Sequence, residues 1–466
     1  MNAIRRKDER KRRLISLERE TLVDGLLLFA TRHPDVDAWV ERMTDTPEGN
    51  VAAFYSELEV LKAGYRYISW SQSHGYALEL IDLLDTLESG EKDPKRGLEA
   101  VGDFFRADSS IMESVDDSNG EVGSVFAQEA VDLFVQYAKS CEDKVWVSQY
   151  WLEILASDDY GVREGLIGAA HRFLCRDDLF SLAQMCKQNA DSEPPGSLRT
   201  HWLYLLSALA RQLKDPVLFE TSRSARADGA SEAALLEIAR EYQNNEMPSQ
   251  ALFFLNRLPT DMSFRAYERD RLLLQVFINL EKKDAAGDLA LAMFRRHPSS
   301  DSLKTLIQII GEEKRHWIIQ DELDRRGKNE AFSVSFATLL LDEGWEGAAG
   351  GYIQARAKEL NGDCYGSLQS LAMSLSTHGQ TLAASLVYRA LLDSILERAQ
   401  SKAYPHGVGY LSELDRLSVH VGDWAGFESH KQYHSGLRSR YARRPAFWSK
   451  YKNISVTLLR PGLIEG

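Results

Sequence analysis

Cysteine is scarce in this sequence. The four cysteines among its 466 residues, Cys141, Cys175, Cys186 and Cys364, form no CxxC pair and are too few for a disulfide framework in a chain of this length. Proteins of reducing compartments use cysteine in this way. The sequence therefore predicts a cytoplasmic location.

Long hydrophobic runs are also missing. No stretch reaches the roughly 20 apolar residues that cross a bilayer. The best early run, residues 22–30, is interrupted by Asp24 and Gly25. The basic start Arg5-Arg6-Lys7 leads into no apolar segment of the kind that a signal peptide requires. We therefore expect no membrane contact.

Positive charge is in deficit, since 56 basic residues face 69 acidic residues and give a formal net charge of −13. Such an excess repels nucleic acid and anionic lipid on average, so either contact requires a local basic patch. A composition of 44% hydrophobic and 27% charged residues can bury a core, and we expect the chain to fold. At about 150 residues per domain, the length accommodates about three domains or one repeat array.

Catalytic and cofactor-binding motifs are absent as well. The sequence contains no HExxH and no GxSxG, the glycines of residues 347–351 do not follow GxGxxG, and residues 327–329 lack the hydroxyl residue of a P-loop. Residues 116–120 fail as a calcium loop, because Val115 and Phe126 stand where carboxylates are required. The sequence predicts a non-enzymatic protein without a cofactor.

Helical periodicity is what the sequence does contain, while the alternating pattern of strands is missing. The clearest stretch begins at Ser231, an expected N-cap, and ends at Asn244-Asn245. Pro248 opens the next helix, Pro259 ends it, and two further helices precede His297-Pro298. The positions expected to face inward are Leu235, Ile238, Ala239, Tyr242, Ala251, Leu252, Leu255, Leu258, Leu273, Val276, Phe277, Leu280, Ala286, Leu289, Ala290, Met293 and Phe294.

These helices form pairs that recur at the period of about 34 to 45 residues found in helical repeats. Short turns make neighbouring helices antiparallel, and stacked pairs bury the apolar face that one pair alone leaves exposed to solvent. The sequence therefore predicts an all-α fold, an α-solenoid of degenerate TPR/HEAT-like helical hairpins with a C-terminal capping segment. The strict tetratricopeptide pattern is not present.

Two breaks divide the chain. Residues 106–124 are rich in Asp, Ser and Gly, and within them residues 116–120 are expected to be a disordered acidic linker. Pro194-Pro195-Gly196 lies in a segment that no helix crosses. We expect an N-terminal helical region over residues 1–190, a helical-repeat region over 197–400, and a C-terminal aromatic and basic capping segment over 401–466.

A family resemblance enters through the C-terminal segment. The residues that carry it are Ser401-Lys402-Ala403-Tyr404-Pro405-His406, Tyr410-Leu411, Asp423-Trp424, Ser429-His430, Tyr433, Leu437-Arg438 and Arg443-Arg444-Pro445-Ala446-Phe447-Trp448. This pattern resembles an uncharacterised bacterial domain-of-unknown-function family that often follows a SWIM zinc finger. The resemblance covers about residues 230–450 and implies a bacterial, cytoplasmic helical-repeat protein. It supplies no catalytic residues.

The zinc finger itself is absent from this chain. A SWIM finger needs CxC followed by CxH, so that three thiolates and an imidazole surround the zinc. The sequence has neither motif. Any nucleic-acid role of that finger is therefore not transferred.

The N-terminal run that contains Arg5, Arg6, Arg12 and Arg13 is the densest positive charge in the chain. On a helix it can contact phosphates or an acidic partner. The alternative is a solvated helix start that pairs with acidic neighbours such as Glu18.

The C-terminal segment offers a second candidate surface. Arginines next to aromatic rings suit the binding of single-stranded nucleic acid or of a phosphorylated ligand. The same residues also suit a cap at the end of the helical array, in which the arginine side chains lie over the aromatic rings. We favour this second interpretation. The candidate interaction residues here are Tyr404, His406, Trp424, Arg443, Arg444, Phe447 and Trp448.

Two pairs at helical spacing contain the residue types of metal ligands. His430 and His434 share a helix face but need a third ligand from elsewhere, and His171 with Cys175 fits core packing better. We therefore assign no metal site.

The function that the sequence favours is a scaffold that binds another protein. The alternative is a nucleic-acid-associated accessory protein that uses its basic ends.

Overall fold

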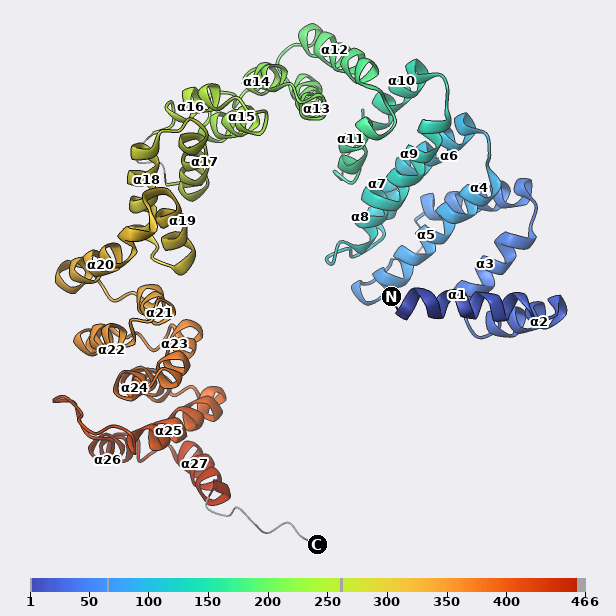
Figure 1. Cartoon of the computed structure of the whole chain (residues 1–466). Coiled ribbons are helices and arrows are strands. Elements are labelled where there is room, and N and C mark those ends of the chain that lie inside the picture. The colour runs from blue at the N-terminus through green and yellow to red at the C-terminus, as the bar shows by residue number, and fades with distance from the viewer. Residues whose placement is uncertain (1, 65–66, 157, 159, 260–262, 459–466) are drawn as a thin grey trace. The chain divides into compact units, whose positions relative to one another are not determined.

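The computed structural model describes residues 2–64, 67–156, 158, 160–259 and 263–458, with side chains except those of residues 2–8, 34–35, 328–329 and 453–458. The chain forms two compact units, Met1–Thr260 and Asp261–Gly466. Within the described residues there is no β-strand, and one isolated bridge joins Ile68 to Val115. The predicted all-α class is confirmed. Each unit stacks antiparallel helical hairpins, as an α-solenoid does (Figure 1).

Unit 1 holds the helices α1 to α16 (Figure 1). They are α1 (Asn2–Ile15), α2 (Arg19–Ala30), α3 (Pro34–Thr44), α4 (Pro47–Lys62), α5 (Ser73–Gly90), α6 (Pro94–Arg106), α7 (Asp108–Glu113), α8 (Glu121–Val125), α9 (Val131–Ser140), α10 (Lys144–Leu155), α11 (Glu164–Gly168), α12 (Arg176–Ser192), α13 (Ser197–Leu213), α14 (Pro216–Ser224), α15 (Glu232–Asn244) and α16 (Pro248–Leu255). Consecutive helices such as α4 and α5, or α15 and α16, pack against each other.

Several of these helices begin where a capping residue precedes a proline. The side chains of Thr46, Asp93 and Asp215 each accept a backbone hydrogen bond from the residue three positions later. The next residue is proline in all three cases, and its fixed φ and missing N–H suit the first helical position. The same local chemistry therefore recurs at successive hairpins.

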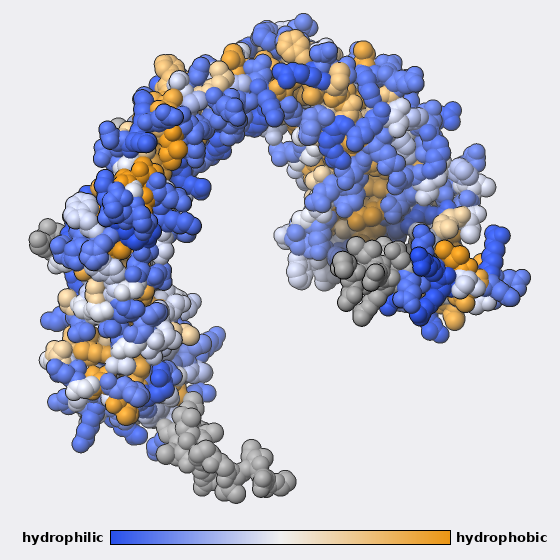
Figure 2. Space-filling view, in the orientation of Figure 1, coloured by the Kyte–Doolittle hydropathy of each residue, from blue (hydrophilic) through white to orange (hydrophobic). Residues whose placement is uncertain are grey.

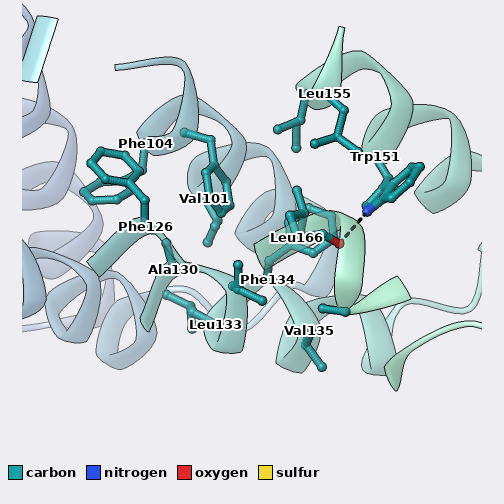
Figure 3. Close-up of a cluster of buried hydrophobic side chains, with 14 of the residues drawn as sticks. Val101, Phe104, Phe126, Ala130, Leu133, Phe134, Val135, Trp151, Leu155 and Leu166 are labelled. Atoms are coloured by element: carbon teal, nitrogen blue, oxygen red, sulfur yellow. Dashed lines mark hydrogen bonds between the residues drawn. The ribbon is translucent and has the colours of Figure 1, made fainter. Parts of the chain in front are cut away.

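The centre of unit 1 is a continuous apolar core (Figure 3). The rings of Phe104 and Phe126 stack with centroids 4.9 Å apart. Trp151 is fully buried, and its Nε1–H donates to the carbonyl of Leu166 at 3.1 Å (Figure 3). A buried indole needs such a partner, so this bond fixes α10 against α11.

The prediction that residues 116–120 are a disordered linker is wrong, and the break predicted over residues 106–124 contains helices. The segment contains α7 and the start of α8, and Ile111 is fully buried. The carboxylate of Asp117 accepts from the backbone N–H groups of Val122 and Gly123, at 2.9 and 2.8 Å. The acidic residues that suggested disorder instead accept hydrogen bonds from backbone N–H groups at the start of a helix and in a turn.

Unit 2 holds the remaining α-helices, which pack mainly against their chain neighbours. They are α17 (Ala266–Asn279), α18 (Lys283–Arg296), α19 (Ser300–Ile310), α20 (Arg315–Asn329), α21 (Val334–Asp342), α22 (Glu346–Ala355), α23 (Tyr365–Thr377), α24 (Thr381–Glu397), α25 (Tyr404–Ser418), α26 (His430–Arg440) and α27 (Pro445–Leu458). A single core cluster runs from α17 to α27.

The four helices predicted from residue 231 onward are confirmed as α15 to α18. Ser231 caps α15 by accepting from the Ala234 N–H at 3.1 Å, and the helix ends at Asn244. Pro248 is the first residue of α16, which ends at Leu255. The predicted boundaries near residues 190 and 400 stay predictions; in the structure α12 packs on α13, and α24 packs on α25, across those positions.

Candidate functional site

The basic N-terminal run lies on α1, where the side chains of Arg12 and Arg13 are exposed. Arg13 pairs with Glu9 one turn earlier, and both side chains face solvent. The side chains of Arg5 and Arg6 lie outside the described residues. Exposed pairs of this kind contribute little to stability, so these cations are accessible to a partner.

The helices next to this run expose an apolar surface, which we call the N-terminal apolar face. Between residues 9 and 49, Ala30 is the one described residue that is buried. Figure 2 shows hydrophobic side chains gathered over α2 and α3. The face comprises Val23, Leu27, Leu28, Phe29, Trp39 and Met43, whose exposed fractions run from 44% to 62%. Contiguous apolar surface of this kind marks interaction sites in soluble proteins.

A second site lies among α25, α26 and α27, where a pocket of about 710 Å³ opens. We call it the C-terminal pocket. Asp415 on α25 joins the other two helices there: His430 Nε2 lies 2.7 Å from its Oδ1, and the Tyr451 hydroxyl donates to its Oδ2 at 2.6 Å. Trp424, His434 and Arg438 also line the pocket.

The electrostatics of the C-terminal pocket follow from these contacts. Burial by itself raises the pKa of Asp415, but the hydrogen bonds from His430 and Tyr451 outweigh it and hold that pKa below its usual value. Burial lowers the pKa of His434, and the nearby His430 and Arg438 act in the same direction against the opposing charge of Asp415. His434 is therefore a neutral donor and acceptor at neutral pH.

The structure places the predicted aromatic residues in the core more than on the surface. Tyr404 and Phe447 are buried, with their rings edge-on at 5.6 Å. Trp448 is 7% exposed, and its Nε1–H donates to the Tyr441 carbonyl at 2.9 Å. These contacts fit the capping role, because buried ring faces are not available for stacking on a ligand.

The predicted polar residues are spread over this end of unit 2. Arg443 is exposed and Arg444 is half-buried, whereas His406 is exposed on α25 away from the C-terminal pocket. The cation over the Trp448 ring is Arg438, at 4.7 Å.

Arg389 on α24 is a buried residue that the sequence reasoning missed. Its guanidinium lies 4.5 Å from the ring centroids of both Trp424 and Tyr433, and its Nη1 donates to the Glu428 carbonyl at 2.9 Å. This sandwich holds the loop before α26 against α24. Asp415 was missed as well, because no local motif links it to His430 or to Tyr451, which lies 36 residues away.

The two histidine pairs do not form metal sites. The His430 and His434 rings are 6.0 Å apart, and His430 is engaged by Asp415. His171 and Cys175 are exposed, so the prediction that they pack in the core is wrong; the chain leaves the helix between them. No group of three or more His, Cys, Asp or Glu residues in the described part of the chain can hold a metal ion.

All four cysteines are free. Cys141 and Cys186 are buried, and burial raises the pKa of Cys186 to about 12.

Among the described helices, none combines the length and the apolar character that a membrane span requires.

Comparison with known proteins gives one family. A model of a family of unknown function (DUF6880) matches residues 47–233 and again residues 204–450. The predicted resemblance to an uncharacterised family is therefore confirmed, and the match also covers most of unit 1. No curated protein matches the chain.

Among solved structures, a structure of Naa15/Naa10 bound to HypK-THB aligns with 81% of this chain at 15% identity and a TM-score of 0.35. The alignment covers 65% of that structure's chain, slightly less than two thirds of its length.

Proposed function

The chain belongs to the family of unknown function (DUF6880), and from this premise we propose that it is a non-catalytic helical-repeat scaffold that binds a partner protein. Stacked helical hairpins suit this role, because each hairpin contributes a small patch to a long surface. The proposal includes a bacterial origin, implied by the family resemblance, and a cytoplasmic location, which the low cysteine content favours.

The observation that carries the proposal is the N-terminal apolar face. Leu28 and Phe29 on α2 are 57% and 51% exposed, and Met43 on α3 is 62% exposed. A helix normally turns its apolar side chains toward a core, so a face whose apolar side chains are all exposed is incomplete without a partner. These helices precede residue 47, where the first family match begins.

The chemistry of the partner follows from the neighbouring charge. Arg10, Lys11, Arg12 and Arg13 are exposed on α1, whose last residue is four positions before the first residue of α2. A cationic helix beside an apolar face complements a segment that carries both acidic and apolar side chains. We therefore commit to a protein segment of that composition as the occupant.

A photo-crosslinking experiment tests this proposal. A crosslinking amino acid replaces Leu28 in one protein and Val145, a 69% exposed residue on α10, in the control. The protein captured through position 28 is then purified, and its affinity is measured. We expect a crosslinked segment with acidic and apolar residues, and an affinity at least about tenfold weaker for Leu28→Glu but unchanged for Val145→Glu.

Other outcomes overturn the proposal. Capture of RNA or DNA with a steep salt dependence that Arg12→Glu/Arg13→Glu removes supports the nucleic-acid alternative instead. Capture of a second copy of this chain makes the face a self-association surface. Equal affinity of Leu28→Glu and wild type contradicts the assignment of this face.

A further inference from the structure

The C-terminal pocket contains basic side chains that no carboxylate in the described part of the chain pairs with through a hydrogen bond or an ion pair. Lys431, His434 and Arg438 follow one another at spacings of three and four on α26, so they share one helix face, and all three line the pocket. Within the described residues, none of these three side chains makes a hydrogen bond or an ion pair. Arg438 rests its guanidinium over the Trp448 ring at 4.7 Å, which fixes its position.

The single carboxylate in the lining is already satisfied. Asp415 accepts at one oxygen from His430 and at the other from Tyr451. Two cations and a neutral imidazole thus face the pocket with hydrogen-bond donors uncommitted, in a chain whose net charge is −13. An anion with several acceptor oxygens satisfies such a set of donors best.

From this arrangement we propose that the C-terminal pocket binds the phosphate group of a small phosphomonoester. Arg438 supplies a planar fork and Lys431 a compact charge, the two donor types that bind phosphate in proteins. The volume of about 710 Å³ accommodates an organic group besides the phosphate. The rings of His434 and Tyr451, whose centroids lie 5.9 Å apart, both line the pocket and offer apolar surface to the organic group. This inference is independent of the partner face on unit 1.

Titration calorimetry with the full chain tests the inference. The probes are phenyl phosphate, inorganic phosphate and benzoate. We expect one site for phenyl phosphate, weaker binding of inorganic phosphate and weaker binding of benzoate. We expect Lys431→Gln and Arg438→Gln each to weaken the binding of phenyl phosphate by about tenfold. The matched control is Arg443→Gln, which removes an exposed arginine outside the pocket and leaves the affinity unchanged.

Folding does not confound the result. Arg438 contacts Trp448 and its replacement can disturb the end of unit 2, but Lys431 is exposed and without partners, so Lys431→Gln isolates the charge. Thermal melts of each variant check that the fold is retained. The inference is overturned if neither phosphate compound saturates a site below about 10 mM. Equal affinity for benzoate and phenyl phosphate, or unchanged affinity in Lys431→Gln, also contradicts it.

Discussion

Asp108 and Arg163 form a bidentate ion pair in the interior of unit 1. Arg163 Nε donates to Asp108 Oδ2, and its Nη2 donates to Oδ1, each at 2.8 Å. The exposed fractions of the two side chains are 0% and 3%, and Arg163 Nη1 also donates to the Ile154 carbonyl. The pair joins the segment after α6 to the segment before α11 across 55 residues of sequence.

Removing one partner of this pair is expected to destabilise the protein strongly. Asp108→Ala leaves a buried guanidinium without its counter-charge, which costs about 3–5 kcal/mol of unfolding free energy. Glu9→Ala breaks the exposed pair with Arg13 and costs less than about 1 kcal/mol. Urea denaturation measures both. Similar losses in the two variants would contradict the difference in burial.

A double variant separates the charge from the packing. Asp108→Leu/Arg163→Met replaces the pair with apolar side chains and is expected to recover much of the stability that Asp108→Ala loses. The same denaturation experiment measures the recovery. A double variant no more stable than Asp108→Ala indicates that the hydrogen bond to Ile154, more than the ion pair, holds this region together.

The capping role that we propose for α27 predicts different effects for two neighbouring residues. Phe447 is fully buried, so Phe447→Ala creates a cavity and costs about 3–5 kcal/mol. Arg443 is exposed, and Arg443→Ala changes stability by less than about 0.5 kcal/mol. The readout is thermal or chemical unfolding of unit 2. A tolerated Phe447→Ala means that the segment is not a cap.

We expect the stability of unit 2 to depend on pH through the C-terminal pocket. The pKa of His434 is lowered below its ordinary value of 6.5, mainly by burial. The unfolded chain therefore binds the proton more readily than the folded one, so the contribution of His434 is fully present above pH 6.5 and is lost as the pH falls through the folded pKa. Asp415, His430 and Arg438 face this residue from α25 and α26.

Denaturation between pH 5 and pH 7.5 tests this dependence. The unfolding free energy of the wild type is expected to decrease below pH 6.5, and the decrease is shallower in His434→Gln. His406→Gln, which replaces an exposed histidine outside the pocket, is the control and keeps the wild-type slope. Identical slopes in His434→Gln and the wild type show that His434 titrates as it does in the unfolded chain.

Close packing of α6 predicts that one glycine resists substitution. A Cβ at Gly102 falls on the Tyr150 hydroxyl and ring, and Tyr150 is held by its hydrogen bond to the Glu99 carbonyl at 3.1 Å. Gly102→Ala therefore overpacks this contact and costs about 1–3 kcal/mol. Gly75 on α5 has open space at the same point, and Gly75→Ala is not destabilising. The melting temperatures of Gly102→Ala and Gly75→Ala measure this difference. Equal values would contradict the close contact between Gly102 and Tyr150.

The helices themselves were predictable from the sequence, because the signals that start and stop them are local. Ser231, Pro248 and the apolar residues at helical spacing predicted α15 to α18, and the structure has helices at those places. The same reasoning failed within residues 106–124, where composition indicated a break in the helices and a disordered linker at residues 116–120. There Asp108 is paired with a distant arginine, and Asp117 caps α8.

The candidate sites depended on contacts that local patterns do not contain. The sequence identified the basic α1 and the aromatic C-terminal segment, but it did not distinguish the buried Phe447 from the exposed Phe29. Nor did it link Asp415 with His430 and Tyr451. Helical periodicity is a property of neighbouring residues, so the sequence by itself determined an all-α chain of stacked hairpins. Which side chains are buried, paired or left facing solvent depends on how distant helices pack, and only the tertiary structure decided that.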